Sequence, residues 1–333
     1  MTNSYSKSDK MRIAYSLGSL LSVNEIIECS KILSKCEPDS VWIPETWGME
    51  GYSMLSAVSQ IIKNSKIGSS IVNIYSRTPT LIAMGAVTVD TLSNGRFILG
   101  LGTSSESIVQ EWHGLEFKNP IQRMRECVDI IRLTISGNKV NYDGQFFQIK
   151  NFNLLIKPPR KNIPIYLAAV NEKMTNLTWE IADGVIFYLR PITELKSTIQ
   201  KMQSKKKIDV ACQLITCVSN DSEKAIEKAK KTLAFYISVG KIYREFLAKN
   251  GFNNETRNIY EEYKKSGLKS NHELVTDTML DSLVISGTPQ ECTKKLKRFI
   301  DSGINLSIIQ FNPLNDVMAS FKLLTDTMSG GKT

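Results

Sequence analysis

The stretch from Lys66 to Gly102 constrains the fold of this chain most strongly, because it predicts a strand, a helix and a second strand in succession. Residues 66–72 are apolar and β-branched, as in a buried strand. Apolar residues then recur at helical spacing over 80–92, after Pro79 at a favourable first-turn position and before Gly95 as a C-terminal stop. Residues 96–99 form the second strand. The stretch therefore predicts a βαβ unit with two parallel strands.

The same alternation continues along the chain, and we predict strands at 11–17, 40–44, 66–72, 96–99, 163–169, 184–188, 208–218 and 305–311, with a shorter β-like segment at 282–286. Helices separate most of them, which predicts a parallel sheet. An open doubly wound sheet and a closed (β/α)8 barrel both fit this pattern. The length of 333 residues and the lack of an early GxGxxG motif favour the barrel.

One part of the chain departs from the alternation. Residues 221–280 are rich in Lys, Glu and Tyr, have a helical pattern and contain no convincing strand. We interpret them as a helical insertion within a single domain that spans residues 11–328. Residues 1–10 and 329–333 are expected to be flexible tails.

The chain is basic, with a formal net charge of +9 and a pI of about 9.1. The longest lysine run is Lys205–Lys207, and the lysines between 224 and 231 alternate with Glu223 and Glu227. This spread is typical of a solvated helix face. No recognised nucleic-acid-binding motif accompanies it, so we predict no nucleic-acid partner.

The six cysteines form no CxxC pair and fall within predicted helices and strands, which favours reduced thiols over disulfides or a zinc site. The two histidines, His113 and His272, are too few for a His-rich metal site and leave little room for a nucleophile–histidine triad. No apolar run approaches the roughly 20 residues of a membrane span, and the N-terminus lacks a signal-peptide core. We predict a cytoplasmic protein without a bound metal.

Two segments of the central unit carry a family resemblance: GSSIVNIYSRTP, from Gly68, and DTLSNGRFILGLG, which ends at Gly102. They resemble the luciferase-like monooxygenase superfamily, most closely its branch of coenzyme F420-dependent oxidoreductases, which contains methylenetetrahydromethanopterin reductase. The resemblance implies a (β/α)8 barrel. It therefore places the site in the loops at the C-terminal ends of the strands.

Glu45 follows the second predicted strand and lies beside Trp47, where a carboxylate can serve as an acid or base. A helix cap or a surface carboxylate is the alternative for the same residue. The resemblance makes Glu45 the catalytic candidate and places Thr46 against the cofactor, where several relatives have histidine. It also implies a non-prolyl cis peptide at Ser70–Ile71 that supports the deazaflavin ring, with Asn73 at the polar edge of the ring.

The loop expected at 100–106 and the start of the helix at 172 complete the predicted site. GxG alone commonly marks a tight turn, but the resemblance gives Thr103 and Ser104 a role in cofactor binding. Several FMN-using relatives have arginine near the position of Thr103. This chain has no arginine there, which favours the deazaflavin over FMN as the cofactor. Backbone N–H groups at a helix N-terminus bind phosphate, and the resemblance assigns this role to Val170 and Asn171. A plain helix cap by Asn171 is the alternative.

The resemblance implies an enzyme that transfers a hydride between coenzyme F420 and a small organic substrate. The leading substrate class is a methylene-tetrahydropterin-type C1 carrier. An FMN-dependent luciferase-like monooxygenase and a non-catalytic cofactor-binding barrel are the alternatives. The resemblance also implies a homodimer, formed through helices near the second and third strands.

Overall fold

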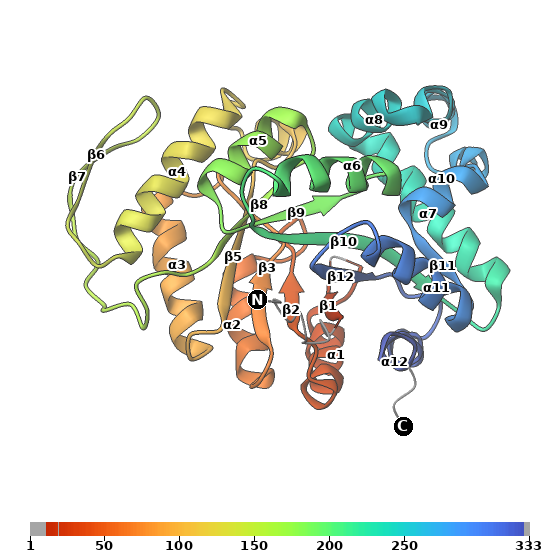
Figure 1. Ribbon diagram of the computed structural model, residues 1–333, viewed down its shortest axis with the longest axis horizontal. Helices are drawn as coiled ribbons and strands as arrows, with labels where there is room; N and C mark the ends of the chain where they lie inside the picture. The colour runs from red at the N-terminus through yellow and green to blue at the C-terminus, as the bar shows by residue number, and fades with distance from the viewer. Residues whose placement is uncertain (1–10, 19, 330–333) are drawn as a thin grey trace, which may run out of the picture.

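The computed structural model describes residues 11–18 and 20–329, and within these residues eight parallel strands close into a barrel (Figure 1). This arrangement confirms the predicted (β/α)8 fold. The predicted tails, residues 1–10 and all but the first residue of 329–333, lie outside the described residues. In ring order the strands are β1 (Arg12–Ser16), β2 (Ser40–Ile43), β3 (Lys66–Ser69), β5 (Phe97–Gly102), β8 (Ile165–Ala168), β9 (Gly184–Tyr188), β10 (Asp209–Val218) and β12 (Leu306–Phe311), which pairs with β1.

Helices cover the outside of this barrel. Capping residues in the sequence determine where several of them begin: Ser22 and Thr288 each form a capping box with the glutamate three residues later. The α-helices outside residues 221–283 are α1 (Val23–Cys36), α2 (Gly51–Ile61), α3 (Pro79–Leu92), α4 (Pro120–Ile135), α5 (Glu172–Ile181), α6 (Ile192–Gln203), α11 (Pro289–Ile300) and α12 (Val317–Met328).

The segment predicted as an insertion is helical, and it packs around its own apolar cluster with the end of β10. The predicted β-like segment at 282–286 becomes the short strand β11 (Ile285–Gly287), which pairs with β10 outside the barrel ring. The helical elements of this segment are α7 (Ser222–Val239), α8 (Lys241–Leu247), η2 (Ala248–Phe252), α9 (Asn253–Ser266), η3 (Asn271–Leu274) and α10 (Asp277–Leu283).

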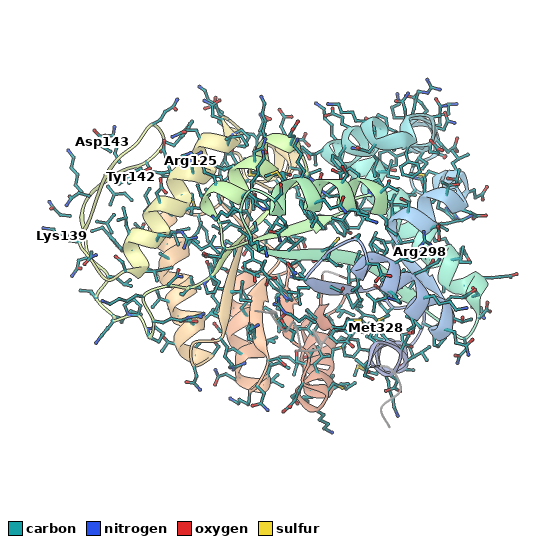
Figure 2. The ribbon with its side chains drawn as sticks, viewed as in Figure 1. Arg125, Lys139, Tyr142, Asp143, Arg298 and Met328 are labelled. Carbon is teal, nitrogen blue, oxygen red and sulfur yellow. The ribbon has the colours of Figure 1, made fainter. Side chains whose placement is uncertain are left out.

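A two-stranded antiparallel hairpin stands outside the barrel beyond α4, at the left of Figure 1. Its strands are β6 (Val140–Asp143) and β7 (Gln148–Phe152), and residues 144–147 form the turn between them. Figure 2 labels Tyr142 and Asp143 on this hairpin and Arg125 on the neighbouring helix.

Two predicted strands differ from the structure. The strand predicted over 66–72 is interrupted after Ser69, and a short strand β4 (Val72–Asn73) then pairs with β5. The predicted strand 96–99 was too short, since β5 continues through Gly102, so Gly100–Gly102 is strand and not loop. The reason is steric. A Cβ on Gly100 would overlap the carbonyl oxygen of Ser69, and one on Gly102 would lie 2.6 Å from Ile71 Cδ1.

The lower part of the barrel interior is apolar and tightly filled. The indole of Trp42 lies over Gly68, where an added Cβ would collide with the ring, so glycine at this position makes room for tryptophan. The residues of this interior cluster come from seven strands: Ala14, Trp42, Ile98, Tyr166, Ile186, Ala211, Leu306 and Ile308.

A charged network closes the N-terminal end of the barrel. The guanidinium of Arg12 donates to Asp39 at 2.9 Å and to both carboxylate oxygens of Asp209 at 2.9 Å. Tyr166 also donates its hydroxyl proton to Asp209. Burial lowers the pKa of Arg12, but the two carboxylates outweigh it and raise that pKa above its ordinary value. This network joins β1 to β2, β8 and β10. The C-terminal end of the barrel, where TIM-barrel enzymes carry their active sites, stays open for a functional site.

Candidate functional site

The interior of the barrel changes from apolar to polar toward the C-terminal ends of the strands. Side chains on a strand alternate between its two faces, so a residue two positions after an interior residue also faces the interior. Two residues beyond cluster members in six of the strands, the side chains are small or polar: Ser16, Gly100, Ala168, Tyr188, Gln213 and Gln310. In β2 the corresponding residue is Pro44, and in β3 Ser70 lies two residues after Gly68. These residues make the C-terminal end of the barrel the candidate site.

Several polar atoms in this layer are buried and have no hydrogen-bond partner within the part of the chain that the structure describes. They are Ser16 Oγ, Ser70 Oγ, Tyr188 Oη, Arg190 Nε and Asn312 Oδ1. All five residues lie at, or within two residues of, the C-terminal end of a barrel strand. Burial also raises the pKa of Tyr188 well above its ordinary value, so this hydroxyl is a hydrogen-bond donor at neutral pH. Unpartnered buried polar atoms are rare in proteins, and their concentration here indicates a place where a ligand completes the bonding.

The β3–β4 junction forms one side of this end. The peptide bond between Ser70 and Ile71 is cis, at the position where the resemblance placed it. The Ser69 hydroxyl donates to Gly100 O at 2.9 Å and accepts from Gly100 N at 2.8 Å, which holds β3 against β5. Asn73 pairs with Gly102, and its Oδ1 accepts from Tyr75 N at 2.8 Å. The amide NH₂ of Asn73 is therefore the part of this side chain left for a ligand.

Thr103 and Ser104 follow β5 and are half-buried. Ser104 has a φ of 58°, in the left-handed region, and the Thr103 hydroxyl donates to its carbonyl at 3.3 Å. The strands β2, β3, β5 and β8 are consecutive in the ring. The structure thus brings the predicted residues of all four loops to one arc of the barrel end.

Glu45 is engaged in an ion pair that sequence analysis did not anticipate. Its carboxylate bonds to Arg77, in the loop before α3, and accepts from Gly51 N at 2.8 Å. Arg77 also bonds to Glu50, which caps α2, and its guanidinium lies over the ring of Tyr52. Burial lowers the pKa of Arg77, but the neighbouring carboxylates raise it overall, so it stays a cation.

Thr46 is half-buried, and Trp47 next to it is exposed and belongs to an aromatic cluster. The ring of Trp47 lies 5.2 Å from that of Trp112, on the short π-helix η1 (Ile108–Trp112), and 6.3 Å from that of Phe235 on α7. The side chains of Trp47 and Trp112 are each 55% exposed. Three distant segments thus bring aromatic rings together at Trp47, which directly follows Thr46.

The N-terminus of α5 lies beside a cavity of about 540 Å³ that extends between α5, α6 and α8. Asn171 caps the helix, since its Oδ1 accepts from Met174 N at 2.9 Å. The carbonyl of Val170 accepts from Arg190 Nη2 at 2.7 Å. Arg190 lines the cavity, is 3% exposed and is also bonded to Glu194. Lys201 and Lys249 also line the cavity, together with the carboxylates of Glu172, Glu194 and Glu245.

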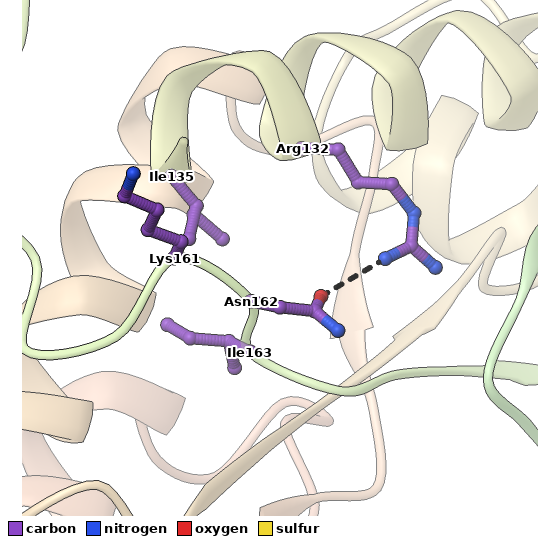
Figure 3. Close-up of a pocket in the computed structure, with 5 residues that line it drawn as sticks. All are labelled: Arg132, Ile135, Lys161, Asn162 and Ile163. Carbon is purple, nitrogen blue, oxygen red and sulfur yellow. Dashed lines mark hydrogen bonds between the residues drawn. The ribbon is translucent and has the colours of Figure 1, made fainter. Parts of the chain in front are cut away.

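A second cavity, of about 250 Å³, lies away from this site (Figure 3). It is lined by Arg132 and Ile135 of α4 and by Lys161, Asn162 and Ile163, just before β8, so it opens toward the N-terminal ends of the strands. Within residues 11–18 and 20–329, no group of three or more His, Cys, Asp or Glu side chains is placed to hold a metal ion. None of the helices described is long and apolar enough to span a membrane.

Sequence analysis missed the residues that complete this site from distant segments, Arg77, Arg190, Tyr188, Gln213 and Gln310. Two of these residues could have been noticed in the sequence. Gln213 and Gln310 are polar residues inside the otherwise apolar strands β10 and β12, at positions that face the interior. Arg77 and Arg190 follow strand ends in the sequence, but their partners become apparent only in the fold.

Comparisons with known proteins agree with this architecture. Over 299 residues the chain is 27% identical to a 5,10-methylenetetrahydromethanopterin reductase from Archaeoglobus fulgidus, covering 86% of this chain and 89% of that protein. It is 26% identical to a putative coenzyme F420-dependent oxidoreductase from Mycobacterium tuberculosis, over 81% of this chain and 86% of that protein.

Among solved structures, the coenzyme F420-dependent tetrahydromethanopterin reductase from Methanopyrus kandleri superposes with a TM-score of 0.83 at 21% identity, covering 96% of this chain and 98% of that one. The sequence profile of the luciferase-like monooxygenase family matches residues 8–306. This match spans most of the barrel and includes the predicted site residues. The chain therefore belongs to the luciferase-like monooxygenase family.

Proposed function

We propose that this protein is a coenzyme F420-dependent oxidoreductase that transfers a hydride between the deazaflavin and a small organic substrate. The observation that carries the proposal is the likeness, over 86% of the chain, to a reductase of the methylenetetrahydromethanopterin type. A second relative, similar over 81% of the chain, is named for dependence on the same coenzyme.

The residues at the barrel end fit a flat ring system that has one polar edge. Ser16, Ser70 and Asn312 hold buried oxygen atoms without a partner among the described residues, and Tyr188 holds a buried hydroxyl. Such atoms gain hydrogen bonds when a ligand with carbonyl and N–H groups binds. The glycines of β5 add no side chains to this end of the barrel, which suits the close approach of a planar ligand.

In this proposal Ser70 and Ile71 support one face of the ring, and the amide of Asn73 meets its polar edge. Thr46, Thr103 and Ser104 make the other contacts with the ring. When bound, the coenzyme supplies the carbon that gives or accepts the hydride. The chain positions the two reactants and excludes water from between them.

The charged end of the coenzyme is proposed to lie at the N-terminus of α5. Free backbone N–H groups in the first turn of α5, after Val170 and Asn171, attract anions. The wall of the adjoining cavity is balanced in charge, since Arg190 and Lys201 pair with Glu194 and Glu172, so the helix N-terminus is the basis for placing the phosphate here. The net charge of +9 supports capture of such an anion at long range.

Glu45 is proposed as the catalytic residue that faces the substrate. Its ion pair with Arg77 suits an electrostatic role, in which the carboxylate stabilises positive charge on the substrate during hydride transfer. A methylene-tetrahydropterin-type C1 carrier fits this requirement. Trp47 follows Glu45 by two residues, and its ring, with those of Trp112 and Phe235 beside it, offers surfaces on which a flat heterocycle can stack.

The proposal is tested by mixing the protein with reduced coenzyme F420 and a panel of oxidised C1 carriers, and following the absorbance of the oxidised deazaflavin. We expect turnover with the tetrahydropterin carrier, and a lower kcat in Glu45→Gln at unchanged coenzyme affinity. Oxygen-dependent turnover with FMN would identify a monooxygenase instead. Unchanged activity of Glu45→Gln with every substrate would remove Glu45 from the mechanism.

We further propose a homodimer that buries the outer face of α3. Leu81 and Met84 lie one turn apart on this helix and are exposed, as is Leu92 at its end. Exposed apolar side chains on one helix face are typical of an interface. Light scattering should give twice the chain mass for the native protein and the chain mass for Leu81→Glu/Met84→Glu. The free, mostly buried cysteines also suit a reducing compartment, so we place the enzyme in the cytoplasm.

A further inference from the structure

The hairpin outside the barrel contacts the site through one arginine. The hairpin turn wraps around the carboxylate of Glu126 on α4, which is 1% exposed. Gln145 N donates to Glu126 Oε1 at 3.0 Å, and Phe146 N donates to Oε2 at 2.9 Å. Phe147 N adds a third bond at 3.3 Å. These three hydrogen bonds hold the turn at a defined place on α4, while Gln122 on the same helix donates to Glu126 Oε1 at 2.9 Å.

Arg123, one turn earlier on α4, is enclosed by aromatic rings. Its guanidinium carbon lies 4.8 Å from the ring centre of Phe147 in the hairpin turn and 4.7 Å from that of Tyr75. Its Nε is buried and has no partner among the described residues, and no carboxylate of those residues lies within ion-pair distance. Arg123 is therefore held by cation–π contacts, which connect the turn to Tyr75.

Tyr75 in turn belongs to the segment that carries the site. Its backbone N donates to Asn73 Oδ1 at 2.8 Å, and its hydroxyl donates to Lys118 O at 3.0 Å. Asn73 pairs with Gly102, and Ile74 N donates to Gly102 O at 3.1 Å. A continuous set of contacts thus runs from the hairpin turn through Arg123 and Tyr75 to the side chain of Asn73.

We propose that Arg123 is a positioning residue: pressed by the hairpin turn, it holds Tyr75 and thereby sets the side chain of Asn73 for the coenzyme. The hairpin then stabilises the conformation of the site, although it lies outside the barrel. This inference rests on the proposed function for its effect on coenzyme binding. Its structural part, the ordering of residues 72–77 by Arg123, is independent of any ligand.

The test compares Arg123→Met with Arg123→Lys and with the control Arg125→Met. Arg125 lies on the same helix, and its guanidinium bonds to Glu180 on α5, away from Tyr75. Two quantities are measured: amide hydrogen exchange across residues 72–77 in the ligand-free protein, and the Kd for coenzyme F420. Phe147→Leu, which removes one ring from Arg123, serves as a second variant if Arg123→Met does not fold.

We expect faster exchange at residues 72–77 in Arg123→Met and Phe147→Leu, but not in Arg125→Met. The Kd of Arg123→Met should rise about tenfold, as the loss of two partly buried cation–π contacts implies. Arg123→Lys should recover most of the affinity because it keeps the cation. Exchange in Arg123→Met that matches Arg125→Met, or that rises equally along the whole chain, would overturn the positioning role. A native protein that binds no coenzyme F420 would overturn the proposed function, while the exchange data would still decide the role of Arg123.

Discussion

The glycines of β5 give the sharpest test of the geometry at the barrel end. A Cβ built on Gly102 lies 2.6 Å from Ile71 Cδ1 and 2.7 Å from Ile71 Cγ1, about 1 Å closer than ordinary contact. The side chain of Ile71 must therefore move in Gly102→Ala. Overpacking of this kind costs about 1–3 kcal/mol. Because Ile71 is proposed to support the coenzyme, its displacement should also weaken coenzyme binding.

Two further alanine variants serve as comparisons for Gly102→Ala, one with a larger expected loss of stability and one with a smaller expected loss. In Gly100→Ala the new Cβ overlaps the backbone oxygen of Ser69, so β3 and β5 must separate, and we expect a much larger loss of stability. In Gly18→Ala, at the end of β1, the nearest atom is Pro44 Cγ at 3.4 Å, which is an ordinary contact. The free energy of unfolding from urea titration and the Kd for coenzyme F420 are measured for all three. Native-like values of both quantities in Gly102→Ala would refute the packing of Ile71 against β5.

Three other predictions concern charged groups. Asp90 is fully buried and accepts hydrogen bonds from Arg160, which is partly exposed, and from Phe97 N. Arg160→Ala should therefore lower the unfolding free energy by about 1–3 kcal/mol, and a loss well under 1 kcal/mol in urea titration would contradict a stabilising role of this pair. Burial raises the pKa of Glu126, but hydrogen bonds to its carboxylate lower it below its ordinary value, so its stabilising effect is present above about pH 4.3 and disappears as pH falls through the lowered pKa. The melting temperature of Glu126→Gln should thus approach that of the native protein as pH falls. A difference in melting temperature that stays the same at every pH would contradict this prediction. Arg12→Met leaves Asp209 without its ion-pair partner and should cost about 1–3 kcal/mol at neutral pH, measured by calorimetry against Lys66→Met, whose pair is more exposed.

The alternation of strands and helices predicted a parallel sheet, because each strand is a short apolar run with recognisable turn residues around it. The chain length, the lack of an early GxGxxG motif and the family resemblance then favoured the closed barrel over an open sheet. The helical pattern of residues 221–280 likewise predicted the segment around α7 and α9. The extent of β5 was wrong, since GxG in a sequence does not reveal that Ser69 and Ile71 lie against those glycines. The pairing of β5 with β3 and β4 decides how far β5 extends, and no local sequence pattern shows that pairing.

The candidate site was predicted as a set of loops, and the structure brings those loops to one end of the barrel. Individual side-chain roles depended on distant partners and were less predictable. Glu45 was found from its position after a strand, but its ion pair with Arg77 depends on how two loops meet. Arg123 carries no sequence signal at all, because its environment is built from residues 48 positions earlier and 24 positions later.

The central claim is that the C-terminal end of this barrel binds a deazaflavin. The most direct measurement is a fluorescence titration of the ligand-free protein with coenzyme F420 and, separately, with FMN. The account predicts saturable, tight binding of coenzyme F420 and much weaker binding of FMN. Tight binding of FMN with no measurable affinity for coenzyme F420 would contradict it.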